Sequence, residues 1–206
     1  MFLKHLYKSA FVPRGITPQY TSIRSLFIAS IGNPEPEYEG TRHNVGHRLM
    51  DQLINIYWKD QLEKVGEDYY RLKRTPHVVL YKSNDSFMNL QGYAIVKHYQ
   101  QFRNQGSEIL FLHDDVQVQL GKYQFRRPTR SHRGHNGLKS IEMYMGNAYR
   151  NIAIGIGRPQ DTKLALSEYV LEKFTEKELE IIDFDVLPKC VKELETYLVG
   201  EPTPLK

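Results

Sequence analysis

A short apolar run near the start of the chain stops abruptly and is soon followed by a helical pattern. Residues 26–31 (LFIASI) are apolar or small, and Gly32, Asn33 and Pro34 end the run. A run of this kind predicts a buried strand. From Val45 onward, apolar residues recur at helical spacing, at positions 45, 49, 53, 54, 56 and 57. The change from strand to helix is typical of α/β folds, and it places His43 at or just before the first helical turn.

The position of His43 suggests a chemical role. Thr41 or Asn44 is expected to cap the first amides of the helix. The positive end of the helix dipole disfavours a charged imidazole there, and a histidine that is neutral at pH 7 can act as a general base. Most histidines at helix starts are solvent-facing caps, so these residues alone leave both roles open.

Strands and helices alternate along the rest of the chain. The further strands are expected at residues 69–73, 77–83, 108–113, 121–127 and 151–157, with 121–127 at a sheet edge. The further helices are expected at residues 87–102, 137–145, 164–170 and 176–199. Pro188 should kink or split the helix at 176–199. The inner face of the helix at 87–102 should be formed by Leu90, Ile95, Val96 and Tyr99. This order predicts one α/β domain over residues 24–206.

Cysteine content and hydropathy exclude several classes of protein. The single cysteine, Cys190, rules out an intramolecular disulfide and a cysteine-based zinc site, and it suits a reducing compartment. We expect it to be a small buried residue of the C-terminal helix. No apolar stretch approaches the length that crosses a bilayer, so membrane insertion is not expected.

The first 23 residues differ from the rest of the chain. They contain Lys4, Lys8 and Arg14 and no acidic residue, and the apolar residues among positions 2–11 would share one helical face opposite the lysines. This composition is typical of an organellar transit peptide, so residues 1–23 are expected to be a basic leader of a mitochondrial protein. The alternatives are a disordered basic arm, a tail that touches RNA, and a cytoplasmic location.

Positive charge is concentrated in one segment. Residues 116–141 contain no acid and six bases, which are Lys122, Arg126, Arg127, Arg130, Arg133 and Lys139. The whole chain carries +4, of which the first 23 residues contribute +3, so the remainder outside this segment sums to −5. A concentrated positive stripe beside a reactive cleft is typical of a protein that binds a phosphate-bearing partner. A solvated hairpin with incidental charge is the alternative.

Three expected strands end in polar residues where an α/β site is expected. Asn33, Asp114 and the Arg158 turn follow buried strands, and ligands bind outside the carboxyl ends of such strands. Asp114 could accept a hydrogen bond from one ring nitrogen of His43 and fix its tautomer, or it could simply cap the next loop. Asn89 and Asn136 stand at expected helix starts, where they would serve as N-caps or as neutral donors to a carbonyl oxygen or oxyanion.

Six sequence blocks, taken together and in order, carry a family resemblance. They are residues 31–34 (IGNP) with Tyr38, 41–46 (TRHNVG), 86–92 (SFMNLQG), 112–115 (LHDD), 133–139 (RGHNGLK) and 154–159 (IGIGRP). This combination, which spans about residues 25–172, resembles the bacterial-type peptidyl-tRNA hydrolases, and it is far more specific than any one of its parts.

The resemblance implies a fold, a reaction and site residues. The fold would be a single-domain, three-layer α/β/α sandwich with a twisted mixed sheet. The reaction would be hydrolysis of the ester between a peptide and the 3′ ribose of tRNA by a monomer without metal, cofactor or protein partner. His43 matches the general base, Asp114 the carboxylate that stabilises its reactive form, and Asn33 the residue associated with choosing N-blocked aminoacyl-tRNA. The positions that hold the peptide or the terminal adenosine are matched by Tyr38, Phe87, Asn89 and Asn136.

The chemistry of these residue types agrees with that reaction, since an activated ester needs a positioned water, a base and donors for the oxyanion. The expected phosphate contacts are Lys122, Arg126, Arg127, Arg130 and Arg133. Two departures concern the phosphate contacts. Residues 128–133 form a longer and more basic stretch than the family's glycine-rich one, and Ala153 stands where many members have an arginine, with Arg150 as the expected substitute.

Two other functions compete with this one. The first is a non-hydrolytic RNA-binding or splicing factor on the same fold, against which the joint presence of His43, Asp114, Asn33 and Asn89 speaks. The second is a metal-dependent hydrolase, whose ligands would come from His113, Asp114, Asp115, His132 and His135. The scatter of these five residues lacks the spacing and support that metal sites need.

Overall fold

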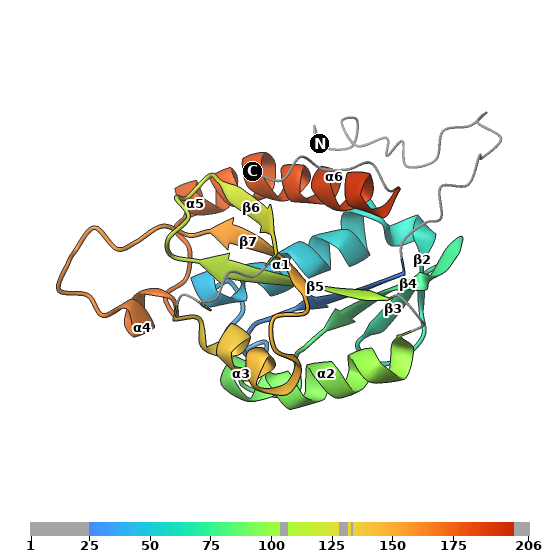
Figure 1. Ribbon diagram of the computed structural model, residues 1–206. Helices are drawn as coiled ribbons and strands as arrows, with labels where there is room; N and C mark the ends of the chain where they lie inside the picture. The colour runs from blue at the N-terminus through green and yellow to red at the C-terminus, as the bar shows by residue number, and fades with distance from the viewer. Residues whose placement is uncertain (1–24, 104–106, 128–131, 133, 200–206) are drawn as a thin grey trace.

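A seven-stranded mixed sheet runs through the middle of the protein (Figure 1). The computed structural model describes residues 25–103, 107–127, 132 and 134–199. The sheet order is β2-β3-β4-β1-β5-β7-β6. The strands are β1 (Leu26–Ser30), β2 (Leu62–Lys64), β3 (Tyr69–Leu72), β4 (Thr75–Lys82), β5 (Glu108–Asp115), β6 (Tyr123–Arg126) and β7 (Arg150–Gly155). The strands predicted from sequence are therefore present, and β2 is an addition.

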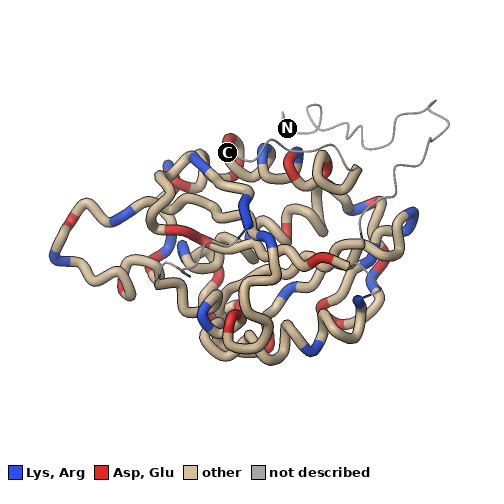
Figure 2. The backbone as a smooth tube through the Cα atoms, viewed as in Figure 1, with Lys and Arg blue, Asp and Glu red and all other residues tan. Residues whose placement is uncertain are grey.

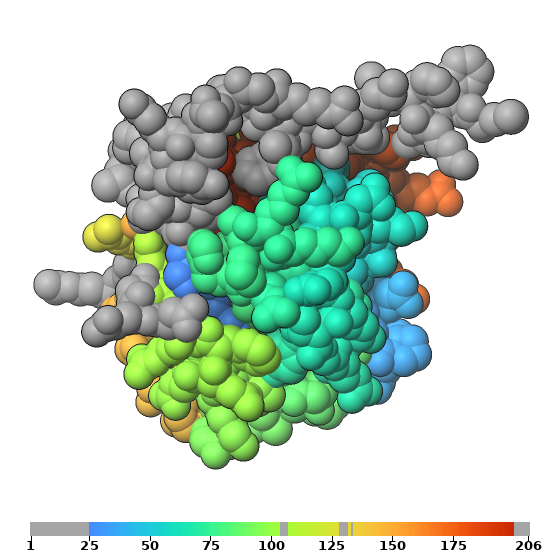
Figure 3. Space-filling view, turned by 90° about the vertical axis from the view of Figure 1, so that its right-hand side faces the viewer, coloured from blue at the N-terminus to red at the C-terminus, as the bar shows by residue number. Residues whose placement is uncertain are grey.

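The central strands are parallel. β1 pairs in parallel with β4 and β5, and β5 pairs in parallel with β7, whereas β2, β3 and β6 join in antiparallel fashion. The carboxyl ends of β1, β5 and β7 consequently meet at one edge of the sheet, at the left in Figure 1. The β2–β4 portion forms much of the opposite end, which faces the viewer in Figure 3.

Helices cover both faces of the sheet, which gives the expected α/β/α sandwich. On one face lie α1 (Val45–Gln52) and α6 (Leu187–Leu198), and on the other lie α2 (Gln91–Phe102) and α3 (Asn136–Met145) (Figure 1). Two shorter helices, α4 (Leu166–Tyr169) and α5 (Glu176–Glu180), complete the C-terminal part. Among the described residues, no helix has both the length and the apolar character needed to span a bilayer.

Each face of the sheet has its own apolar core because side chains alternate along a strand. Ile28 and Leu110 pack on the α1 and α6 side, whereas Phe27 and Phe111 pack on the α2 and α3 side. Cys190 is fully buried in α6, as expected. Pro188 lies at the start of α6, directly after the π-helical turn Ile181–Val186, so the C-terminal helical stretch changes its winding next to the proline expected to kink or split it.

Local helix geometry overturns three expectations. The helix that starts at Val45 continues as a π-helical turn over Leu53–Tyr57, and this wider turn leaves Ile56 57% exposed instead of buried. Leu90 lies in a 3-10 turn before α2, so it misses the inner face and is 64% exposed. Neither Thr41 nor Asn44 caps α1 with its side chain.

Gly46 brings the first turn of α1 close to the central sheet. A Cβ atom at this position would lie 2.3 Å from the main-chain oxygen of Leu112 on β5. Only glycine permits this approach, and it sets the start of α1 directly beside the carboxyl end of β5. The expected basic leader, residues 1–23, lies outside the described residues, as do Arg130 and Arg133.

Candidate active site

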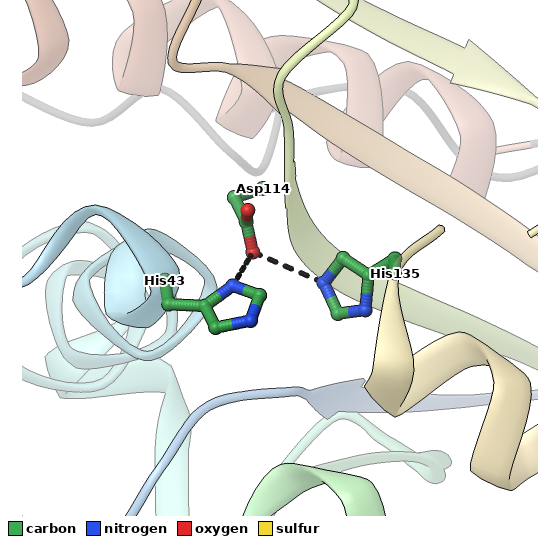
Figure 4. Close-up of side chains that lie close together, drawn as sticks. All are labelled: His43, Asp114 and His135. Carbon is green, nitrogen blue, oxygen red and sulfur yellow. Dashed lines mark hydrogen bonds and ion pairs between the residues drawn. The ribbon is translucent and has the colours of Figure 1, made fainter. Parts of the chain in front are cut away.

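His43 and Asp114 meet at the carboxyl edge of the sheet (Figure 4). His43 lies in the 3-10 turn Arg42–Asn44 that precedes α1, and Asp114 is the penultimate residue of β5. The His43 Nδ1 and Asp114 Oδ1 atoms are 2.7 Å apart. The side chain of Asp114 is buried and that of His43 is 13% exposed. The contact predicted between them is present, so Asp114 is more than a cap for the next loop.

The ionisation state of Asp114 follows from its neighbours. Burial alone would favour the neutral acid, but the electrostatic interactions and hydrogen bonds with His43 and His135 outweigh burial and hold the pKa of Asp114 well below its usual range. An ionised carboxylate only accepts hydrogen bonds, so His43 donates its Nδ1–H. The lone pair of His43 therefore resides on Nε2, which is the nitrogen that can accept a proton.

The turn that carries His43 is braced by the C-terminal part of the chain. The main-chain N–H of His43 donates to the oxygen of Val170 at 2.8 Å. The neighbouring Arg42 is buried, with its guanidinium 3.1 Å from Glu172, 3.0 Å from Glu178 and 4.3 Å above the ring of Tyr169. This brace holds the imidazole in place, and no pattern in the sequence paired Arg42 with acids so far along the chain.

His135 is a member of the site that the sequence reasoning assigned only to a metal cluster. Its Nε2 atom lies 3.0 Å from the same Asp114 oxygen that His43 contacts (Figure 4). Its Nδ1 atom accepts the N–H of Leu138 at 3.3 Å, which caps α3. Asn136, the expected cap, is instead the first residue of that helix. The segment Gly134–Gly137 at an expected helix start was the signal that could have shown His135 as the cap.

The three polar side chains also bear on metal binding. His43, Asp114 and His135 offer ligand atoms that all lie within 4.8 Å of one another. However, both histidines point an N–H at the carboxylate, at 2.7 and 3.0 Å, whereas ligands around tetrahedral zinc stand about 3.4 Å apart. A bound cation would have to replace both hydrogen bonds. The arrangement therefore fits a hydrogen-bonded cluster better than a metal centre, and the wider set with Asp115 and His132 is not brought together as ligands within the described residues.

A cavity of about 220 Å³ opens beside this cluster. His43, Asp114, His135, Asn136 and Arg126 are among the residues that line it. His113 also lines the cavity, with Nδ1 on the main-chain oxygen of Asp114 at 2.6 Å. The His43 imidazole thus lines the same cavity as the predicted amide Asn136 and the predicted cation Arg126.

The other predicted substrate residues, Asn33, Tyr38, Phe87 and Asn89, do not line this cavity. Asn44 links the two groups, because its side chain accepts the N–H of Asn33 at 2.8 Å and donates to the oxygen of Asn33 at 2.9 Å. Asn33 is buried, and its Oδ1 accepts the N–H of Met88 at 3.1 Å. Its Nδ2 group is thereby the end left to donate. Tyr38 and Phe87 pack edge to face with their ring centroids 5.9 Å apart, and Asn89, two residues after Phe87, is exposed.

An ion-pair network supports the Asn33 loop. Lys82, at the end of β4, contacts Glu35 at 2.5 Å and both carboxylate oxygens of Asp51 at 2.8 Å. Burial disfavours the charge on Lys82, but these hydrogen bonds outweigh burial and raise its pKa. Glu35 also accepts the Asn44 amide at 3.4 Å. These contacts fix the loop at Asn33 and at Glu35, which suits a residue that must hold one orientation.

Not every base of the positively charged segment is available to bind a phosphate. Lys122 and Arg127 are exposed, but Arg126 pairs with buried Asp115 at 2.5 Å and also contacts Gln124. Basic and acidic residues are interspersed over the described chain in Figure 2. Arg150 cannot substitute for an arginine at position 153, because it starts β7 and pairs with Glu108 at 2.9 Å, far from the carboxyl edge.

Comparison with known proteins assigns this geometry to a family. A family model described as peptidyl-tRNA hydrolase matches residues 27–203. The chain belongs to the peptidyl-tRNA hydrolase family. A peptidyl-tRNA hydrolase of Pseudothermotoga lettingae is 37% identical over 83% of this chain and 89% of the relative. A Saccharomyces cerevisiae peptidyl-tRNA hydrolase is 31% identical over 84% of this chain and 96% of its own length.

The solved structures agree with the sequence comparison. A variant of peptidyl-tRNA hydrolase from Acinetobacter baumannii superposes with a TM-score of 0.70 and 26% identity, over 88% of this chain and 91% of that one. The family resemblance and the fold class predicted from the six sequence blocks are therefore confirmed. All the predicted site residues fall inside the part of the chain that matches the peptidyl-tRNA hydrolase model.

Proposed function

We propose that this protein hydrolyses the ester bond between a peptide, or an N-blocked aminoacyl group, and the 3′ ribose of tRNA, and so releases free tRNA for recycling. The observation that carries the proposal is the contact between His43 Nδ1 and Asp114 Oδ1, 2.7 Å long, at a cavity on the carboxyl edge of the sheet. This contact orients a histidine whose second nitrogen can act as a base.

The reaction follows from the hydrogen-bond donors and acceptors of the site. His43 Nε2 takes a proton from a water molecule, whose oxygen attacks the ester carbonyl carbon. Asp114 stabilises the imidazolium that forms. The carbonyl oxygen becomes an oxyanion, for which the Asn136 side chain in the cavity is a suitable neutral donor. As the tetrahedral intermediate collapses, the bond to the 3′ oxygen breaks and the proton on His43 passes to that oxygen. No serine or cysteine nucleophile is required.

We assign the selection of N-blocked substrates to Asn33, which does not line the cavity but is hydrogen-bonded to Asn44 beside His43. Because Asn33 Oδ1 is occupied by Met88, its Nδ2 group is a donor that favours a peptide carbonyl over the ammonium of a free aminoacyl group. Tyr38, Phe87, Asn89 and Asn136 would contact the peptide or the terminal adenosine. Lys122, Arg126 and Arg127, with Arg130 and Arg133, would contact tRNA phosphates, so that affinity decreases with salt.

The state and location of the protein belong to the same proposal. We assign it as a monomer that acts without a protein partner, and as a mitochondrial enzyme, on the basis of the basic composition of residues 1–23. A mass measurement of the N-terminus of the protein from purified mitochondria tests the assignment. An intact N-terminus in the cytosolic fraction alone would favour the cytoplasmic alternative.

The decisive test compares the wild type with His43→Ala. We expect the wild type to release peptide from purified peptidyl-tRNA, and the variant to bind the same substrate with a release rate lowered by about 10²–10⁴-fold. Equal rates in the two proteins would remove the enzymatic function. They would leave the non-hydrolytic RNA-binding alternative in its place.

A further inference from the structure

Two histidines share one oxygen atom of Asp114 (Figure 4). His43 approaches Oδ1 through Nδ1 at 2.7 Å, and His135 approaches the same atom through Nε2 at 3.0 Å. The two ring centroids are 5.0 Å apart. Their side chains come from different elements, the turn before α1 and the start of α3, so the sharing is a product of the tertiary fold.

The helix cap fixes the tautomer of His135. Its Nδ1 accepts the N–H of Leu138, so Nδ1 carries a lone pair and the proton of the neutral ring is on Nε2, which faces Asp114. Protonation of Nδ1 would set two N–H groups against each other and break the cap of α3. His135 is thereby held as a neutral donor to the carboxylate.

We propose that His135 is a positioning residue that takes up part of the Asp114 charge and so keeps the His43 imidazole unprotonated near neutral pH. A carboxylate oxygen with a single donor stabilises that donor as a cation more strongly than an oxygen that serves two. An unshared Asp114 would therefore favour the imidazolium form of His43, which cannot accept a proton from water. This inference rests on the proposed function, in which unprotonated His43 is the base.

The other titratable and charged groups near the pair, within the described residues, include His113, Arg126 and His132. His113 from β5 stands edge-on to the His135 ring at 5.0 Å, and burial, with the nearby His135, lowers the pKa of His113 to about 3, so it is neutral. Arg126 from β6 is paired with Asp115 of β5. His132 lines the same cavity, whereas the residues that α4 contributes to the lining, Leu166 and Ser167, are uncharged.

Two substitutions separate the bond to Asp114 from the cap of α3. In His135→Asn, the side-chain oxygen can accept the Leu138 N–H, and asparagine is a favoured N-cap, but the side chain is too short to reach Asp114. In His135→Gln, the terminal NH₂ stands where Nε2 stood and can still donate to the carboxylate. Thermal stability measured for both checks that α3 remains folded.

The readout is the protonation of His43. We expect His135→Asn to shift the acidic limb of the kcat/KM profile upward by about 0.5–1 pH unit, whereas His135→Gln stays close to the wild type. If His135 only supported α3, its substitution would lower stability or kcat and leave the acidic limb of the kcat/KM profile at the same pH. If His135→Asn does not fold, His135→Ser tests the same point, because serine also caps a helix and does not reach Asp114.

A titration followed by NMR keeps this test independent of catalysis. The ring nitrogens of His43 in the full chain, assigned by their loss in His43→Ala, should titrate at higher pH in His135→Asn than in the wild type. An unchanged or lower titration point overturns the proposal, even if the enzyme is active. A different outcome is that the wild type releases no peptide while the His43 titration point still lies higher in His135→Asn than in the wild type. That outcome would contradict the proposed function but support the sharing of Asp114.

Discussion

The cluster around Asp114 and the basic segment that begins at Lys122 lie close together but are built in opposite ways. Asp114 is buried and holds two histidines at 2.7 and 3.0 Å, and the turn that carries His43 is braced through Arg42. Lys122 and Arg127 are exposed. A buried cluster is sensitive to protonation, whereas exposed charges are sensitive to screening. The chemistry and the tRNA affinity should therefore respond to different perturbations, pH and salt respectively.

The largest effect should come from Asp114→Asn. An asparagine amide can donate to His43 Nδ1 and so hold the imidazole in the wrong tautomer, which should lower kcat by about 10²–10⁴-fold. Affinity for tRNA should change little, because no phosphate contact is lost. Single-turnover release and tRNA binding, measured side by side, separate the two quantities.

Asp115→Asn is the matched control for that change, because this neighbouring carboxylate pairs with Arg126 and does not contact His43. A loss for Asp114→Asn that appears only in affinity would contradict the distinction between the two regions.

Stability should depend on pH through buried histidines. Burial lowers the pKa of His47 and His113 to about 3, whereas an unfolded histidine titrates near 6.5. The unfolded chain therefore binds up to two more protons between these pH values. The stabilisation is complete above pH 6.5 and is lost as the pH falls, by up to about 2.7 kcal/mol per pH unit. Urea unfolding at pH 7, 6 and 5 measures the slope, and a flat profile would show that these rings are protonated in the folded state.

A smaller effect is expected from Arg126→Ala. We expect KM for peptidyl-tRNA to rise by about 3–10-fold and the salt dependence of binding to flatten by about one phosphate contact. Arg150→Ala is the control, since Arg150 pairs with Glu108 at the far end of β7. If kcat collapsed while the salt dependence stayed the same, Arg126 would belong to the reactive cluster and the comparison of the two regions would have to be redrawn.

The smallest effect should follow metal removal. Both nitrogens of His135 are engaged, one by Asp114 and one by Leu138, so the cluster has no need of a cation to hold it together. Dialysis against EDTA should leave peptide release unchanged. Activity that disappears in EDTA and returns with zinc would restore the metal-dependent alternative.

The sequence predicted those parts of the molecule that depend on local pattern. Apolar runs gave β1, β5 and β7, and parallel strands bring their carboxyl ends together, so the contact between His43 and Asp114 could be foreseen. The roles of Asn33, Tyr38, Phe87, Asn89 and Asn136 came from the family resemblance and stay predictions.

What could not be foreseen depends on tertiary contacts or on irregular helix geometry. His135 reaches Asp114 only because the start of α3 lies beside the end of β5, and Arg42 finds its acids some 130 residues away. Asn44 clamps the Asn33 backbone instead of capping α1. Ile56 and Leu90 are exposed because a π-helical turn and a 3-10 turn break the 3.6-residue period from which their burial was predicted.

The brace on the His43 turn has a consequence for synthesis of the protein. The acceptors for Arg42 and for the His43 main chain are Val170, Glu172 and Glu178, which are translated long after the turn itself. A nascent chain that ends before these residues carries the base and Asp114 but lacks the brace on the turn that holds the base. The braced reactive centre is therefore completed only late in translation. Until then, the growing chain is itself a peptide esterified to tRNA, the class of substrate proposed for the finished protein.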